Sequence, residues 1–171
     1  MSPTPVDIRP LRADAARNRA RVLEAARELM GARGVEVGME EIARQAGVGV
    51  GTVYRHFPNK EALISALAED RFARIAAVLT EALEDPDPWH GFETMMRRTA
   101  EIHVADRALS EVMRNHGDAM QAAAEKYGVP ELNERLIERC KAAGAIREEV
   151  HHGDIPMIMC GVGIATCSAA G

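Results

Sequence analysis

The sequence predicts an all-α protein, and three observations support that prediction. Aromatic residues make up only 4% of the 171 residues, and the alternating pattern of β-branched and polar residues typical of strands is absent. Apolar residues instead recur every three or four positions along most of the chain. The long segments are rich in Ala, Leu, Glu and Arg, which favour helices intrinsically. We therefore expect helices joined by short turns, with no sheet.

The N-terminal elements are separated by glycine and proline. We expect a flexible basic arm over residues 1–14 and a first helix over residues 15–33, which Gly34 ends. A second helix over residues 39–46 ends at Gly47, and a third over residues 50–57 is closed by Pro58. Residues 59–83 predict a long fourth helix, for which Asn59 is a suitable N-cap.

The remaining elements follow a short linker. Residues 84–88, with the sequence EDPDP, form the clearest break in the chain. Beyond it we expect helices over residues 89–104, 107–115 and 118–143, the last interrupted near Gly128 and Pro130, and a final helix from Asp154.

Charge is divided unevenly along the chain. Residues 1–60 hold ten Lys and Arg against seven Asp and Glu, whereas residues 61–171 hold eleven against nineteen. A basic N-terminal part favours a polyanionic partner at that end. No apolar run is long enough to cross a bilayer, and the N-terminus lacks the apolar stretch of a secretory signal. We therefore expect a cytoplasmic protein with no membrane partner.

Catalytic and metal-binding motifs are absent from the sequence. It contains no nucleophile elbow, no P-loop and no HExxH motif. The spacings of four histidines and the three cysteines match no standard zinc site: His103, His116, His151 and His152 with Cys140, Cys160 and Cys167. We expect no enzyme activity, no cofactor and no metal.

The segment from Met39 to Leu63, MEEIARQAGVGVGTVYRHFPNKEAL, fits a helix-turn-helix. Its second helix spans roughly 12 Å, enough to cross a DNA major groove. Val53 and Phe57 are expected to face inward. The outward residues are Val50, Gly51, Thr52, Tyr54, Arg55 and His56, which offer contacts to base edges and phosphates. On this pattern alone, a simple αα-corner without DNA binding remains an alternative.

The same residues resemble the TetR family of transcriptional regulators. The resemblance covers RVLEAARELMGARG at 21–34, EEIARQAGV at 40–48 and GTVYRHFPNKEAL at 51–63. It implies that Thr52, Tyr54 and His56 contact the DNA backbone and that Lys60 reaches a phosphate. It assigns base reading to Val50, Gly51, Thr52 and Arg55, and further phosphate or minor-groove contacts to Arg9, Arg12, Arg17, Arg19 and Arg21. Gly38 and Gly49 depart from the family pattern, because hydroxyl residues usually cap these two helices.

The resemblance also implies a domain organisation. Residues 15–60 would form the DNA-binding domain, and residues 61–171 a helical effector-binding and dimerisation domain. The residues expected to line the effector cavity are mostly apolar: Trp89, Phe92, Met95, Met96, His103, Met113, His116, Met120 and Tyr127. This composition favours an apolar or aromatic small molecule. For the methionines, a gap-filling role in the core is the alternative.

The predicted function is that of a ligand-responsive repressor. A homodimer, paired through the small residues of segment 159–170, would bind a pseudo-palindromic double-stranded DNA operator. The effector would release it. Two other classes remain open: a helical protein–protein adaptor that has lost DNA binding, and a small-molecule-binding all-α enzyme.

Overall fold

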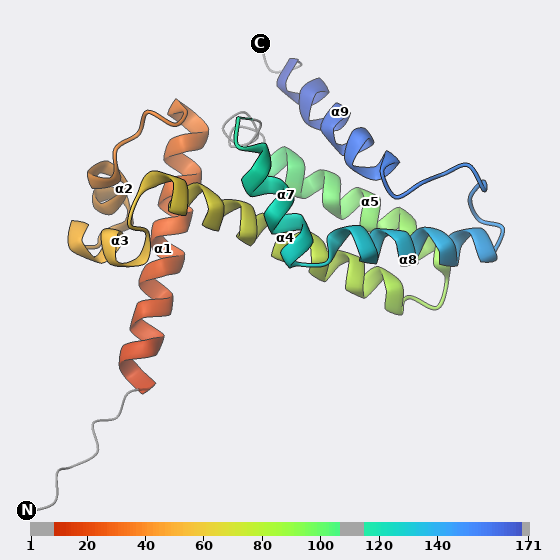
Figure 1. Cartoon of the computed structure of the whole chain (residues 1–171), viewed down its shortest axis with the longest axis horizontal. Coiled ribbons are helices and arrows are strands. Elements are labelled where there is room, and N and C mark those ends of the chain that lie inside the picture. The colour runs from red at the N-terminus through yellow and green to blue at the C-terminus, as the bar shows by residue number, and fades with distance from the viewer. Residues whose placement is uncertain (1–8, 107–114, 169–171) are drawn as a thin grey trace, which may run out of the picture. The chain divides into compact units, whose positions relative to one another are not determined.

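The computed structural model describes residues 9–106 and 115–168, and every regular element in these ranges is a helix (Figure 1). The all-α prediction is therefore confirmed. The helices are α1 (Arg9–Arg33), α2 (Met39–Ala46), α3 (Val50–His56), α4 (Lys60–Glu84), α5 (Pro88–Ala105), α7 (Gly117–Lys126), α8 (Val129–Ala142) and α9 (Asp154–Ser168). The helix predicted at 107–115 lies outside the described residues except for Asn115.

The predicted flexible arm is wrong for residues 9–14, because α1 begins at Arg9 rather than Ala15. The physical reason is local. Pro10 lies in the first helical turn, where a missing backbone N–H is tolerated. Asp14 then pairs with Arg17 one turn later on the helix surface. Residues 1–8 lie outside the described part of the chain.

The chain divides into two compact units, Met1–Leu63 (unit 1) and Ile64–Gly171 (unit 2). The boundary falls inside α4, just past the predicted division between residues 60 and 61. In unit 1, α1 packs against α2 and α3. The side chains of Val22, Met30, Ile42 and Leu63 are fully buried in this small core, which holds the helix-turn-helix in place.

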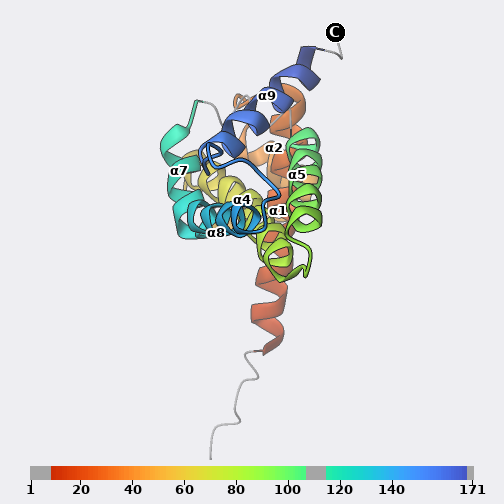
Figure 2. The ribbon, with the colours of Figure 1, turned by 90° about the vertical axis from the view of Figure 1, so that its right-hand side faces the viewer.

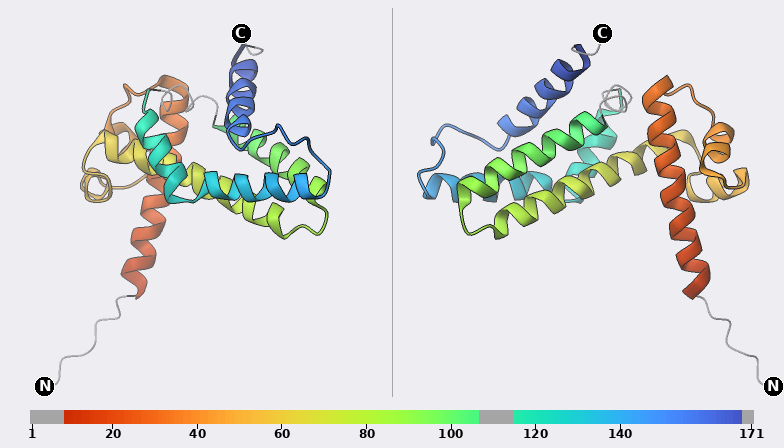
Figure 3. Two further views of the ribbon diagram at one scale, coloured as in Figure 1. Left: turned by 45° about the vertical axis from the view of Figure 1, so that its right-hand side comes forward. Right: turned by 180° about the vertical axis from the view of Figure 1, so that it is seen from behind.

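Unit 2 has its own apolar core, built from α4, α5, α8 and α9. α8 packs against both α5 and α7 and lies between them in Figure 2. Leu79, Met95 and Leu136 are central to this core. Figure 3 shows α4 and α5 running side by side as a hairpin. They approach so closely that a side chain at Gly91 would meet the Ala82 carbonyl oxygen at 2.5 Å.

Polar contacts fix both ends of the α4–α5 connection. Asp87 caps α5 by accepting hydrogen bonds from the backbone N–H groups of Trp89 at 2.9 Å and His90 at 3.3 Å. The Arg139 guanidinium of α8 donates to backbone carbonyls at the end of α4, including that of Leu83 at 3.0 Å. These bonds satisfy carbonyls that have no partner within the helix. Within the described residues, no helix is long and apolar enough to cross a membrane.

Candidate nucleic-acid interface

The turn between α2 and α3 depends on Gly47. This residue adopts φ 62° in the left-handed region, which glycine enters without steric cost. The following N–H of Val48 donates to the Ala43 carbonyl at 3.0 Å and closes the end of α2. A side chain at Gly47 would lie 2.6 Å from Arg21 Nη2, and this same nitrogen donates to the Gly47 carbonyl at 3.3 Å. The turn is thus both left-handed and closely packed against α1.

Glycines occupy the N-cap positions of both helices of the motif, as predicted. Gly38 and Gly49 are extended, and neither helix has a side-chain cap hydrogen bond. The backbone N–H of Thr52 instead donates to the Gly49 carbonyl at 2.8 Å. Glycine at an N-cap costs only a few tenths of a kcal/mol relative to serine or threonine, so this departure does not disturb the motif.

α3 is anchored to the core of unit 1 along one side. Val53 is 0% exposed and Phe57, which follows the helix, is 2% exposed, so both belong to the core of unit 1 as predicted. The Arg19 guanidinium lies 5.5 Å from the centre of the Phe57 ring. Around the rest of the helix, Val50, Gly51, Tyr54 and Arg55 are exposed, and Thr52 and His56 are half-buried. Val53 is the only buried residue of α3, so the six residues predicted as the contact surface are all at least partly accessible.

Tyr54 has an acidic partner that the sequence analysis missed. Its hydroxyl donates to Glu40 Oε1 on α2 at 3.2 Å. The negative charge of Glu40 raises the pKa of Tyr54, and burial and the hydrogen bond add to this effect. The two residues are 14 positions apart on different helices. Only the packing of α3 against α2 brings them together, so no sequence pattern could have indicated the contact.

The side chain of Lys60 makes a hydrogen bond within the protein. Its ammonium donates to the Val35 carbonyl in the turn between α1 and α2, and the residue is half-buried. Next to it, Asn59 caps α4 as predicted, since its side-chain oxygen accepts from the Ala62 N–H at 2.8 Å. An ammonium has three donors, so the bond to Val35 leaves others for a phosphate.

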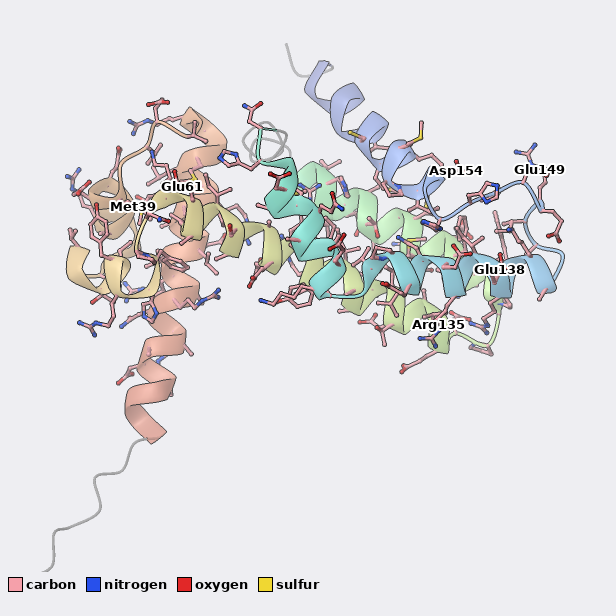
Figure 4. All side chains as sticks on the ribbon, in the orientation of Figure 1. Met39, Glu61, Arg135, Glu138, Glu149 and Asp154 are labelled. Carbon is pink, nitrogen blue, oxygen red and sulfur yellow. The ribbon has the colours of Figure 1, made fainter. Side chains whose placement is uncertain are left out.

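The five arginines expected to add phosphate or minor-groove contacts all lie on α1. The side chains of Arg9 and Arg12 are outside the described residues. Arg17 pairs with Asp14, whereas Arg19 and Arg21 contact Phe57 and the Gly47 carbonyl. Arg19 and Arg21 therefore stabilise the helix-turn-helix through direct contacts. Figure 4 labels Met39, the first residue of α2, and Glu61, in the first turn of α4.

The residues predicted to line an effector cavity are distributed over unit 2. Met95 is fully buried in the core, and Phe92, Met96 and Tyr127 pack against that core. Trp89 is exposed and stacks on Phe92 with ring centres 5.9 Å apart. His103, His116 and Met120 are half-buried, and Met113 lies outside the described residues.

A groove in unit 2 has a different lining. It has a volume of about 370 Å³ and runs along the seam between α4 and α5. Its walls are Arg74, Ala77, Val78, Arg98, Glu101, Ile102 and Ala105. None of these was among the predicted lining residues. In the part of the chain that the structure describes, no group of three or more His, Cys, Asp or Glu side chains is placed to hold a metal ion.

Comparison with known proteins decides the family. A family model described as bacterial regulatory proteins, tetR family, matches residues 22–67, from α1 into α4. A TetR transcription regulatory protein of known structure from Mycobacterium vanbaalenii is 38% identical, with a TM-score of 0.70. The alignment covers 93% of this chain and 98% of that one. The chain belongs to the TetR family.

Other TetR-family members are similar over different lengths. A TetR transcriptional regulator from Streptomyces coelicolor is 27% identical, with a TM-score of 0.62, and the match covers 86% of this chain and 85% of that one. A curated HTH-type transcriptional regulator of Staphylococcus aureus is 46% identical over 54 residues. That match spans 31% of this chain and 29% of the curated relative.

Proposed function

We propose that this TetR-family chain is a DNA-binding transcription regulator that acts in the cytoplasm as a homodimer on a pseudo-palindromic operator. The observation that carries the proposal is the accessible face of α3, which the Gly47 turn and the buried Val53 and Phe57 present outward. A seven-residue helix of this kind fits a major groove.

The contacts divide by chemistry. The Arg55 guanidinium, the side chains of Val50 and Thr52 and the backbone of Gly51 would face base edges. Tyr54, His56 and Lys60 would donate to phosphates, which position the protein without reading sequence. Arg44 and Arg55 are exposed, and no ion pair involving either is described, so both charges are available to the DNA.

Dimerisation is proposed through α9. Met159 begins the segment 159–170 that was predicted as the pairing surface, but its side chain is 3% exposed and belongs to the core of unit 2. Ile155, one turn earlier, faces the core as well. Met157 and Ile158 lie on the outer side and are 74% and 49% exposed. These two residues are the apolar surface that we propose a second copy covers.

We propose that a small-molecule effector bound in unit 2 lowers operator affinity, which makes the protein a repressor. α4 runs without interruption from Lys60 to Glu84 and belongs to both units. A shift of this helix would therefore reach the residues next to α3. A typical coupling of about 1–3 kcal/mol would weaken DNA binding roughly 5- to 150-fold.

Selection of bound sequences from random double-stranded DNA tests the proposal. We expect enrichment of one pseudo-palindrome with half-sites about one helical turn apart. A protein–protein adaptor would enrich no sequence. Weak binding without sequence preference would also contradict the proposal, because contacts to phosphates alone carry no sequence information.

A further inference from the structure

A buried ion pair joins the C-terminal end of α5 to the middle of α4 within unit 2. Asp106 is the C-cap residue of α5, and its side chain is 1% exposed. The Arg74 Nη2 group of α4 donates to Asp106 Oδ2 at 2.6 Å. Arg71, one turn earlier on α4, is 3% exposed; burial lowers its pKa, and the charge of Asp106 acts against that shift. One carboxylate at the end of α5 therefore interacts with two arginines of α4.

The position of Asp106 is unfavourable for its own helix. The C-terminal end of a helix carries a partial negative charge, which repels a carboxylate. Burial adds the cost of removing the charge from water. His103 lies on the last turn of α5, but burial and then the charge of Arg71 lower its pKa, which favours the neutral imidazole. The interaction that offsets these costs is therefore the one with the arginines of α4.

This ion pair is one of two places where the packing of α4 against α5 is closely defined. Near the start of α5, a side chain added at Gly91 would meet a backbone carbonyl of α4 at 2.5 Å. At the other end of α5 lies the pair of Asp106 with Arg74. A further pair, Arg98 with Glu81, is partly exposed to solvent, where ion pairs contribute little. At its C-terminal end, α5 is therefore held to α4 mainly through Asp106.

We propose that Asp106 is a positioning residue for operator binding, which acts through Arg74 and Arg71 by holding α4 in a single position against α5. From these arginines α4 continues without interruption back to Lys60, next to the helix-turn-helix. In a homodimer, a fixed α4 keeps the two α3 helices at the separation that successive major grooves require. Without the ion pair, α4 takes several positions, and only some of them fit both half-sites. This inference rests on the proposed function, the binding of a dimer to a pseudo-palindromic operator.

Two DNA duplexes test the inference: the selected operator and a duplex that contains only one of its half-sites. In Asp106→Asn we expect the affinity for the complete operator to fall at least about fivefold. Its affinity for the single half-site should be unchanged, because each α3 keeps its own contacts. A variant that merely folds less well would lose affinity for both duplexes alike.

Asp70→Asn is the matched control. Asp70 lies 3.4 Å from Arg74 Nε, but it is one turn earlier on α4 itself, so this pair cannot hold α4 against α5. The substitution makes the same change from acid to amide next to the same arginine. Asp70→Asn should therefore bind both duplexes like the parent.

Arg74→Gln breaks the same ion pair from the α4 side. The Arg74 side chain is 38% exposed, so this variant should fold even if Asp106→Asn does not. It should show the same selective loss for the complete operator, and the double variant should lose no more than either single variant. Arg135→Gln removes the same charge at an exposed position of α8 (Figure 4) and should bind like the parent.

Two results overturn the positioning role of Asp106. One is that Asp106→Asn and Arg74→Gln bind the complete operator as tightly as the parent, and the other is that they lose equal affinity for both duplexes. A parent protein that binds the two duplexes equally has a different meaning. That result contradicts the proposed binding of a dimer to a pseudo-palindrome, and the inference is overturned with it.

Discussion

The Tyr54 hydroxyl on α3 donates to the Glu40 carboxylate on α2 at 3.2 Å, so the tyrosine proposed to contact a phosphate is already bound to an acid. A phosphate would have to compete with Glu40 for this donor and would meet its negative charge at close range. The raised pKa of Tyr54 is the expected consequence of that charge.

Replacing Glu40 with Gln should therefore strengthen DNA binding. Replacing the carboxylate with an amide weakens the hydrogen bond to the Tyr54 hydroxyl and removes repulsion of the phosphates, for which we expect a gain of roughly 2- to 10-fold at low salt. Fluorescence anisotropy with labelled operator measures this gain. Glu36→Gln, an exposed residue with the same change in charge, is the control. Equal gains in both variants would mean that net charge alone, and not the bond to Tyr54, limits affinity.

The same substitution should lower the pKa of Tyr54 toward its ordinary value. The raised pKa arises mainly from the charge of Glu40, which Glu40→Gln removes. The tyrosinate absorbance should therefore appear at lower pH in the variant than in the parent during a spectrophotometric titration. A titration that does not change would show that the two side chains do not interact in solution.

Gly51→Ala should separate folding from DNA binding. No atom lies within 4 Å of a side chain placed at Gly51, and the residue is helical, so alanine should stabilise unit 1 by about 0.5–1 kcal/mol. If the backbone of Gly51 approaches the bases, the added methyl group should weaken operator binding at the same time. Chemical denaturation and anisotropy report the two quantities. Higher stability with unchanged affinity would place Gly51 away from the DNA.

Gly47→Ala should destabilise unit 1, and Gly144→Ala supplies the comparison. Both glycines have positive φ, 62° and 66°, which costs alanine about 1–2 kcal/mol. Only at Gly47 does the new side chain meet another group, Arg21 Nη2 at 2.6 Å, whereas nothing lies within 4 Å at Gly144. The loss of unfolding free energy should be larger at Gly47. Similar losses at both positions would show that Arg21 moves aside at no cost.

Lys60→Ala should lower both stability and DNA affinity. The lysine holds the Val35 carbonyl in the α1–α2 turn, so its removal should lower the melting temperature of unit 1. If it also contacts a phosphate, binding to all sequences should weaken and the salt slope should fall by about one unit. A lower melting temperature with an unchanged slope would assign Lys60 a purely structural role.

The sequence predicts the helix-turn-helix well because its limits are local. Gly47 ends α2, Pro58 ends α3, and Asn59 caps α4, each through its own backbone or side chain. The predicted start of α1 was wrong, because a proline such as Pro10 can either break a helix or stand in its first turn. The contacts of Tyr54 with Glu40 and of Lys60 with Val35 join residues 14 and 25 positions apart, so they depend on tertiary packing.

Unit 2 was harder to predict because apolar periodicity does not distinguish a core from a cavity wall. Met95 fits the apolar helical periodicity and is a core residue, not a cavity-lining one. Arg71 interrupts that periodicity and is nevertheless buried. The negative charge that accompanies Arg71 comes mainly from Asp106, the residue that follows α5, and only the fold brings this residue close to α4.

The central claim, that α3 reads DNA, is tested most directly by the operator affinity of Arg55→Ala at several salt concentrations, with Arg97→Ala on α5 as the control. Both residues are exposed arginines, so each substitution removes one positive charge from the surface. We predict that Arg55→Ala loses roughly 5- to 150-fold in affinity for the selected operator, as the loss of a base contact worth about 1–3 kcal/mol implies. Its binding to unrelated DNA should fall far less, and Arg97→Ala should bind like the parent. Equal affinities of Arg55→Ala and Arg97→Ala for the operator would contradict the claim.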